Sequence, residues 1–89
     1  MNLKIEKKFD GRAVVTSPKR IGQIVRQVRK VSKLSQREAA FLCGVGVRFL
    51  SDFENGKESV HLGKALHVLR AFGLLIVLKK KKLPNEQGS

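Results

Sequence analysis

Apolar residues recur at helical spacing in four separate stretches of the chain. The first stretch begins at Ser17-Pro18, where Ser can accept the free N–H groups of a first turn and Pro suits the first helical position. Its apolar positions are Ile21, Ile24, Val25, Val28 and Val31. Because basic residues occupy the positions between them, the pattern predicts an amphipathic helix with a strongly basic outer face.

The second and third stretches are short and close together. Ser35-Gln36-Arg37-Glu38 has the form of a capping box, which opens a helix that Gly44 ends. The apolar positions of the next helix are Val47, Leu50 and Phe53. It ends at Asn55-Gly56, and only residues 44–46 separate it from the helix before. Two short helices joined by so brief a turn indicate a helix-turn-helix.

A fourth helix and one strand complete the pattern. The apolar positions of the helix are Leu62, Ala65, Leu66, Leu69 and Phe72, and Gly73 ends it. The run that follows is continuously apolar and too short for a helix, so it predicts a strand formed by Leu74, Leu75, Ile76, Val77 and Leu78. A lone strand leaves an edge unsatisfied, and pairing with the same strand of a second copy would satisfy it. We therefore expect a two-fold homodimer.

The two ends of the chain have a different composition from residues 17–78, which we take as a single domain. In residues 1–16, two short stretches flank Asp10-Gly11, a dipeptide suited to a tight turn, so either a small hairpin or a partly disordered arm fits. Residues 79–89 begin with four lysines and lack the apolar residues that would offset the entropy of ordering. We expect them to form a flexible basic tail.

The charge of the chain narrows the choice of partner. Its 89 residues hold 19 Lys and Arg against 7 Asp and Glu, a formal net charge of +12. Such an excess indicates a polyanionic partner, which leaves nucleic acid, an anionic membrane surface or an acidic protein. No apolar run reaches the roughly 18 residues of a membrane span, and the N-terminus lacks a signal-peptide core, so a cytoplasmic location is expected. Lys79–Lys82 beside the apolar Leu74–Leu78 keeps membrane-surface binding open as an alternative.

Two other classes of function are less well supported by the residues. RNA-binding proteins that recognise single strands use exposed aromatic platforms, whereas Trp and Tyr are absent here and Phe41, Phe53 and Phe72 fit the core pattern. Cys43 and the two histidines do not have the spacing of a zinc site or of a nucleophile with its base. We therefore expect Cys43 to be a small buried side chain, and the protein to have no metal, no cofactor and no enzymatic activity.

The residues expected to contact bases lie on the outward face of the third helix. With Leu50 and Phe53 turned inward, the outward set is Val47, Arg48, Ser51 and Asp52. Arg48 can offer two parallel N–H donors to a guanine, and Val47 can pack on a thymine methyl group. Asp52 would be repelled by phosphates unless it accepts from a cytosine amine or holds a neighbouring Arg in place.

Contacts to the DNA backbone are expected around the start of the second helix. Gln36 lies in its first turn, where backbone N–H groups and the side-chain amide can meet a phosphate. We group Gln36 with the base-contact residues as well. Further residues expected to bind phosphate are Lys33, Ser35, Arg37, Asn55 and Lys57.

The stretch SQREAAFLCGVGVRFLSDFENGK resembles the helix-turn-helix of the Cro/cI-like (XRE) repressor family, and the resemblance covers about residues 17–78. It implies a mainly α, lambda-repressor-like domain of four to five helices with a short C-terminal dimerisation strand. The part FLSDFENGK, followed by a helix and a strand, looks most like HipB-type antitoxins.

The resemblance also implies roles for individual residues. The positions of the family that commonly touch DNA correspond to Gln36, Val47, Arg48 and Asp52. Arg29 and Glu54 match a structural ion pair that joins the first and third helices, which makes Arg29 part of the scaffold. Gly46 departs from the family pattern, since a hydroxyl or amide cap is common there, and this weakens the phosphate contact expected at Gly46.

For a HipB-type antitoxin, the resemblance implies a dimer that represses its own operon by binding an inverted repeat in double-stranded DNA. It further implies a HipA-like kinase toxin as partner. A stand-alone XRE-family repressor without a toxin remains the alternative, followed by a basic RNA-binding protein.

Overall fold

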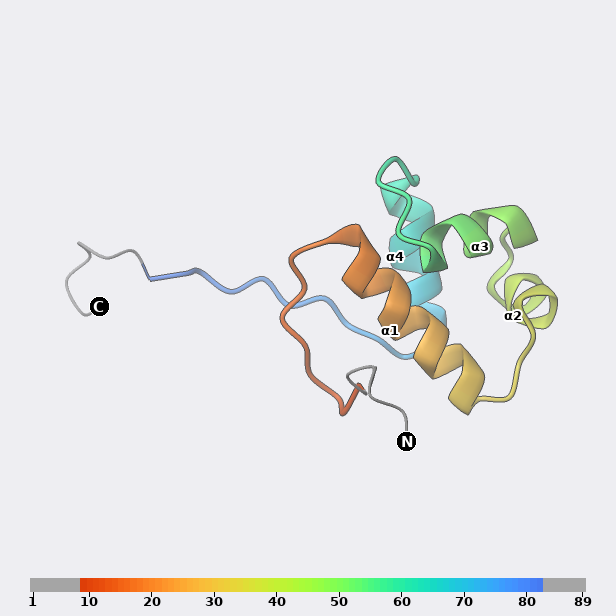
Figure 1. The fold of residues 1–89 in the computed structure, drawn as a ribbon, viewed down its shortest axis with the longest axis horizontal. Coiled ribbons are helices and arrows are strands. Elements are labelled where there is room, and N and C mark those ends of the chain that lie inside the picture. Colours follow the sequence, from red (N-terminus) through yellow and green to blue (C-terminus); the bar gives the residue numbers. More distant parts are fainter. Residues whose placement is uncertain (1–8, 83–89) are drawn as a thin grey trace, which may run out of the picture.

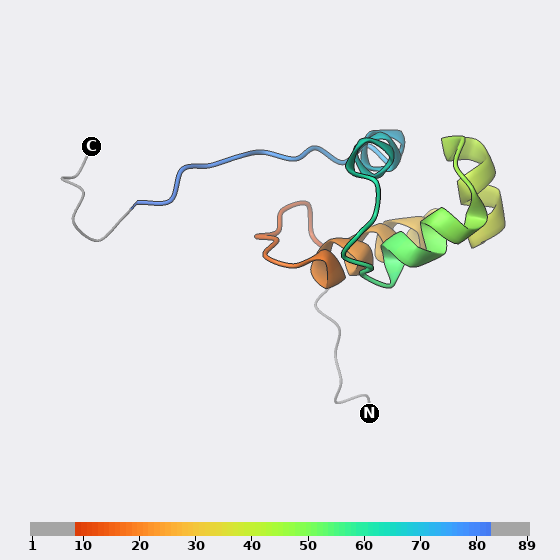
Figure 2. The same ribbon diagram turned by 90° about the horizontal axis from the view of Figure 1, so that it is seen from above.

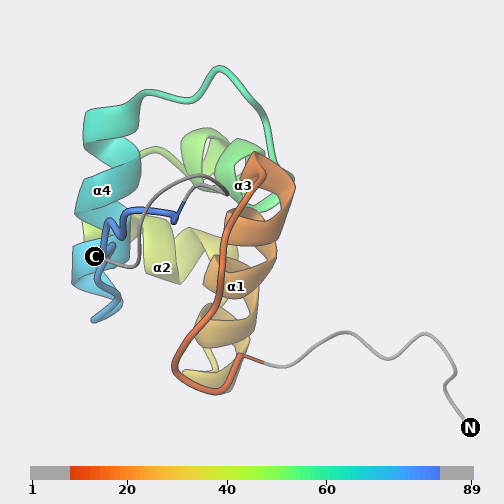
Figure 3. The same ribbon diagram turned by 90° about the vertical axis from the view of Figure 1, so that its left-hand side faces the viewer.

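The computed structural model describes residues 9–82 and contains four helices in that range. They are α1 (Pro18–Val31), α2 (Gln36–Cys43), α3 (Val47–Glu54) and α4 (Leu62–Ala71). Figure 1 shows α2 and α3 on the same side of α1, and Figure 3 shows α4 on the opposite side of the domain from α1. The mainly α fold predicted from the sequence is confirmed, and none of the helices in residues 9–82 is long and apolar enough to cross a membrane.

The ends of the helices lie where the sequence signals put them. The Ser17 hydroxyl accepts a hydrogen bond from the backbone N–H of Arg20, with an N···O distance of 3.1 Å, and Pro18 begins α1. At α2 both halves of the capping box are formed, and the hydrogen bonds from Ser35 lower the pKa of Glu38. Gly44 ends α2 in the left-handed conformation with φ +72°. Local sequence therefore decides these boundaries.

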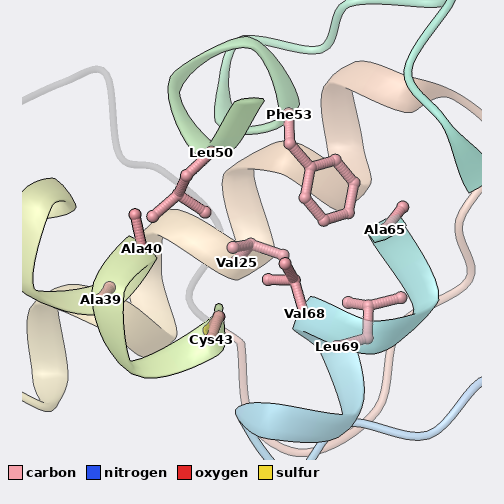
Figure 4. Packing of buried hydrophobic residues seen from close by; sticks show 9 residues of the cluster. All are labelled: Val25, Ala39, Ala40, Cys43, Leu50, Phe53, Ala65, Val68 and Leu69. Atoms are coloured by element: carbon pink, nitrogen blue, oxygen red, sulfur yellow. The ribbon is translucent and has the colours of Figure 1, made fainter. Parts of the chain in front are cut away.

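The core lies where the four helices meet (Figure 4). Val25 of α1, Leu50 of α3 and Val68 of α4 are fully buried at its centre. The side chains that α2 contributes are small, namely Ala39, Ala40 and Cys43. Because small side chains let helices approach closely, α2 packs tightly against α3 while only one of its faces is covered.

Two glycines allow α1 to lie against the C-terminal end of α3. A Cβ atom on Gly22 would stand 2.4 Å from the carbonyl oxygen of Phe53 and 2.6 Å from that of Glu54. Gly56, with φ +81°, would bring a Cβ atom to 2.7 Å from the Cα of Lys19. This close approach was not predicted, because Gly22 occupies an ordinary helical position and only the neighbouring helix excludes a side chain there.

The predicted strand is not formed in the single copy. Residues 74–78 have no regular secondary structure among the described residues, and they run away from the helical body (Figures 1 and 2). A strand requires a hydrogen-bonded neighbour, and the described part of one copy offers none to this segment. The strand prediction therefore depends on a second copy.

The N-terminal arm is irregular in its described part. Residues 9–16 contain no strand, and the first stretch of the expected hairpin, in residues 1–8, lies outside the described residues. The backbone N–H of Phe9 donates to Oε1 of Gln27 over 3.0 Å, which ties the arm to α1. Because the first half of the expected hairpin lies outside the described residues, the choice between a hairpin and an arm stays a prediction.

One expected core residue is on the surface. Phe41 is 83% exposed, so the prediction that it belongs to the core is wrong. Since α2 turns Ala39, Ala40 and Cys43 inward, Phe41 falls on the opposite side of the helix. The apolar positions Val31, Leu42 and Leu62 are also exposed, whereas Phe53 is buried and Phe72 half-buried as predicted.

Both histidines form hydrogen bonds at the ends of helices. His61 is the N-cap of α4, where its Nδ1 accepts a hydrogen bond from the backbone N–H of Lys64 over 3.1 Å. His67 on α4 donates from Nε2 to the carbonyl of Cys43, the last residue of α2, over 2.8 Å. The second bond joins α4 to α2. Both histidines thus have structural partners.

Candidate nucleic-acid interface

The outer face of α3 (Val47, Arg48, Ser51 and Asp52) points away from the core. Leu50, Phe53 and Glu54 are buried on the opposite side of this helix. Arg48 and Val47 are exposed, and Ser51 and Asp52 are half-buried. The structure thus brings together on one surface four of the side chains that the sequence grouped as base-contact residues.

Arg29 and Glu54 form a buried ion pair between α1 and α3. The guanidinium donates from Nε to Oε2 of Glu54 over 2.6 Å and from Nη2 to Oε1 over 3.0 Å. Its Nη1 donates to the carbonyl of Leu34 over 2.8 Å. These hydrogen bonds to Glu54 raise the pKa of Arg29. Each of the three guanidinium nitrogens of Arg29 therefore has an internal partner, in line with the scaffold role that the resemblance implies.

Gln36 is the third member of this buried network. Its Nε2 donates to Oε1 of Glu54 over 2.9 Å, so α2 is joined to the α1–α3 pair. An amide nitrogen has two protons, and only one of them is used in this bond. The other proton and the first-turn backbone N–H are the groups that Gln36 can still offer to DNA. Sequence reasoning gave Gln36 a DNA contact and missed this structural one.

Asp52 has a partner on its own surface. Its Oδ2 lies 3.6 Å from Nζ of Lys57, and the side chains are 34% and 55% exposed. The backbone N–H of Lys57 also donates to the carbonyl of Asp52 over 3.0 Å. The sequence suggested that Asp52 could hold a neighbouring Arg, whereas the residue it holds is Lys57. At this exposure the ion pair contributes roughly 0–1 kcal/mol.

The residues expected to bind phosphate lie in or next to the first turn of α2 and at the two ends of α3. The loop before α2 carries Lys33 and Ser35, and Arg37 is exposed in the first turn of that helix. Asn55 caps the C-terminal end of α3. At the other end of α3, Gly46 is the N-cap and provides no side-chain hydrogen bond, consistent with the departure noted in the sequence.

Lys33 has an unusual backbone conformation. With φ +61° it is the one residue other than glycine in the described range with a positive φ. Its N–H donates to the carbonyl of Lys30, and the next residue, Leu34, donates to that of Arg29, so the turn that ends α1 requires this conformation. An L side chain is strained in the left-handed region, which glycine adopts easily.

Replacing Lys33 by glycine should therefore stabilise the domain while weakening DNA binding. We expect the free energy of unfolding to rise by about 0.5–1 kcal/mol, because the strain of the left-handed residue is removed. Urea denaturation measures this change. A loss of binding that shrinks as salt is raised would indicate that the Lys33 side chain contacts a phosphate. A Lys33→Gly variant with lower stability than the wild type would contradict the assignment of strain to this turn.

The carboxylates, histidines and Cys43 of residues 9–82 are the side chains with metal-binding or nucleophilic chemistry. No group of three His, Cys, Asp or Glu side chains in that range is arranged to hold a metal ion. Burial raises the pKa of the Cys43 thiol, which disfavours the thiolate form that a nucleophile needs. As predicted, Cys43 is a small buried side chain of the core.

Comparison with known proteins agrees with this geometry. A family model described as Helix-turn-helix matches residues 25–77. The chain is 45% identical over 62 residues to y4mF, an uncharacterized HTH-type transcriptional regulator of Sinorhizobium fredii (strain NBRC 101917 / NGR234). That match covers 70% of this chain and 82% of y4mF. A second regulator of the same organism, y4dL, is 40% identical over 63 residues, but the match covers only 32% of its length.

Solved structures give the same fold. HipB in the HipA-HipB-O2-O3 complex superposes with a TM-score of 0.71 at 24% identity, covering 80% of this chain and all of that one. HipB in its complex with an O4 20mer gives the same score, identity and coverage. The restriction-modification controller protein C.AhdI from Aeromonas hydrophila has a TM-score of 0.57 at 29% identity, covering 65% of this chain and 88% of its own. From its sequence and its fold, this chain belongs to the XRE-type helix-turn-helix family.

Proposed function

We propose that this protein is a sequence-specific DNA-binding transcriptional repressor of the cytoplasm that inserts α3 into the major groove. The observation that carries the proposal is the outer face of α3, where Arg48 is exposed on a helix whose other side is anchored in the core. A major groove accepts one helix, and side chains on the outer face of that helix reach the base edges. The names of the relatives y4mF and y4dL support a regulatory role.

The buried network makes this face rigid. Glu54 at the end of α3 is bonded to Arg29 of α1 and Gln36 of α2, so the three helices hold a fixed relative orientation. A base contact depends on such preorganisation, because an Arg that must first be ordered loses binding free energy. Phosphate contacts from Lys33, Ser35, Arg37, Gly46, Asn55 and Lys57 would then set the register on the duplex.

The active form we propose is a homodimer joined through residues 74–78. In one copy this segment is apolar, extended and largely exposed, which supports pairing with a second copy. Two copies of α3 would then contact half-sites about one helical turn apart, roughly 34 Å. The operator should therefore be an inverted repeat, and bound protein would block transcription without catalysis.

Arg48→Ala should relax the preference for one base pair in each half-site. A bidentate contact between Arg and guanine discriminates against other bases by about 1–3 kcal/mol, which is roughly 5- to 150-fold in affinity. The measurement is a set of gel-shift titrations over all single substitutions of a half-site. Uniform weakening at every position would instead show that Arg48 binds a phosphate.

Lys57→Ala should weaken binding to all sequences alike. A lysine bound to a phosphate contributes through counterion release, so the slope of log K against log salt should fall by about 1. Lys79→Ala is the matched control, because Lys79 lies on the segment that runs away from α3 (Figure 1). If the two variants had the same salt slope, the phosphate contact of Lys57 would be refuted.

We also propose that the protein is the antitoxin partner of a HipA-like kinase toxin. The support is the likeness of fold to HipB in its complex with HipA and DNA, together with FLSDFENGK, which resembles HipB-type antitoxins. The N-terminal arm and the basic tail lie outside the predicted domain of residues 17–78, and we propose either of them as the contact with the toxin. The alternative is a repressor that acts without a toxin.

A single experiment separates these possibilities. The DNA upstream of the coding region and a scrambled duplex are titrated at fixed salt, and the untagged products of the adjacent genes are co-expressed and purified together. A specific shift with a co-purifying kinase supports the antitoxin, and a specific shift alone supports the stand-alone repressor. Equal affinity for both duplexes would refute sequence-specific repression and favour RNA or architectural binding.

A further inference from the structure

Exposure alternates along the C-terminal segment, residues 74–78. Leu74 is half-buried against the core and Ile76 is 50% exposed, whereas Leu75 and Val77 are 84% and 79% exposed. Successive side chains of a strand point to opposite faces, so this alternation already has the period of a strand. Leu74 packs against the core and Ile76 is less exposed than its neighbours, so we call their side of the segment the inner face and the side of Leu75 and Val77 the outer face.

Leu78 breaks the alternation. Its position in the sequence puts it on the inner face with Leu74 and Ile76, yet it is 92% exposed. Figure 2 shows the segment running away from the helical body, and within residues 9–82 the side chain of Leu78 is left almost uncovered. Within residues 9–82, the backbone N–H groups of residues 75–78 also have no backbone partner. Both the Leu78 side chain and the strand edge are therefore available to a second chain.

We propose that two copies pair antiparallel through this segment with the two-fold axis at Ile76, so that Leu78 of each copy covers Leu74 of the other. The proposal rests on the homodimer proposed above and adds its register. In this register Leu74 is opposite Leu78, Leu75 is opposite Val77, and Ile76 is opposite itself. Directly opposite residues of an antiparallel pair share a face, so the inner face of one copy meets the inner face of its partner.

Other registers are disfavoured by the residues on either side. An axis between two residues would pair inner with outer side chains, which a pleated ribbon does not allow. An axis at Leu75 would require pairing by Phe72 and Gly73, which form the end of α4, where Gly73 has φ +77°. An axis at Val77 would set Lys80 against Leu74 on the inner face and bury a charge. Only the axis at Ile76 pairs residues 74–78 entirely with one another, without using the end of α4 or a lysine.

A hollow in the domain fits the position that this register gives to Leu78. Most of the lining of this hollow is apolar and includes Leu34, Leu42, Ala71 and Phe72. The hollow lies at the C-terminal end of α4, close in sequence to Leu74, the first residue of the C-terminal segment. The partner's Leu78, lying beside Leu74, would cover this side of the domain. The exposed Leu42 and the half-buried Phe72 thus gain a neighbour on dimerisation.

Cysteine substitutions at positions 75, 76 and 77 test the register. With the axis at Ile76, the two Cα atoms of Ile76→Cys lie about 4.5–5.5 Å apart, within the range that a disulfide spans. The corresponding atoms of Leu75→Cys or Val77→Cys lie about 8 Å apart, beyond that range. Under mild oxidation of the full chain, we expect about tenfold more disulfide-linked dimer from Ile76→Cys than from either neighbour. Wild-type protein, with buried Cys43, gives the background.

A pair of arginine substitutions tests the inner face. Leu78→Arg and Val77→Arg change adjacent residues of similar exposure, and neither contributes to the core of one copy. Leu78→Arg should weaken the dimer by about 100-fold in sedimentation equilibrium, because a charge is then buried against the partner, whereas Val77→Arg should leave it dimeric. Circular dichroism checks that both variants keep the wild-type helix content.

Any other outcome of the cysteine or arginine substitutions would contradict the register with its axis at Ile76. Preferential linkage at position 75 or 77, or equal linkage at all three, excludes an axis at Ile76, and so does a Leu78→Arg variant that remains dimeric. If an operator shift persists in such a case, only the register fails and the proposed repressor stands. A monomeric wild type, with linkage at background for all three cysteines, would refute both the register and the dimer of the proposed function.

Discussion

Glu54→Ala is expected to lower the free energy of unfolding by about 3–5 kcal/mol, because it leaves the Arg29 guanidinium buried without its carboxylate. The side chains of Arg29 and Glu54 are only 9% and 1% exposed, so water cannot replace the lost partner. Gln36 loses an acceptor in the same step. Since small domains have stabilities of about 5–15 kcal/mol, the loss should be visible as a large fall in the thermal midpoint.

Two controls separate the buried pair from a general effect of charge. Glu58→Ala removes a carboxylate from an exposed loop position and should change stability by less than about 0.5 kcal/mol. The double variant Arg29→Met with Glu54→Leu should recover much of the loss, because no unpaired buried charge remains. Stability is measured by urea denaturation followed by circular dichroism. A Glu54→Ala variant as stable as Glu58→Ala would refute the structural role of the pair.

Gly22→Ala is expected to lower the free energy of unfolding by about 1–3 kcal/mol, although alanine is normally the better helix former. The added Cβ atom would lie 2.4 Å from the Phe53 carbonyl oxygen, a backbone atom that moves only if α3 shifts away from α1. Because Glu54 follows Phe53 on α3, the same shift would disturb the ion pair with Arg29. DNA affinity should therefore fall together with stability.

Gly63→Ala is the matched control, since Gly63 also lies inside a helix. There the nearest atom to an added Cβ is the ring Cε1 of His61, at 3.0 Å, which belongs to a side chain that can move. Helix propensity favours the alanine and any displacement of the His61 cap opposes it, so the control should change stability by less than about 1 kcal/mol. Equal effects of the two substitutions in urea denaturation would mean that the α1–α3 contact is not tight.

Features that depend on neighbours in the chain could be predicted from the sequence. The capping box at Ser35, the N-cap at Ser17 and the left-handed Gly44 each use bonds that close within a few residues, so residue type suffices to identify them. The outward face of α3 likewise follows from helical geometry once Leu50 and Phe53 are recognised as apolar.

Features that depend on packing could not be predicted in this way. The pattern placed Phe41 in the core, but the small side chains of α2 take that side and leave Phe41 exposed. The pairing of Asp52 with Lys57 and of Gln36 with Glu54 needed the distances between side chains, because several partners were equally compatible with the sequence.

The sequence by itself determined the four helices, their ends, the basic charge and the family, because each of these is set by local bonds, by the spacing of apolar residues or by residue type. The tertiary structure alone decided how α1 meets α3 at Gly22 and which groups surround Glu54, since both depend on atoms far apart in the chain. It also showed that residues 74–78 are unpaired in one copy, because a strand exists only beside another strand.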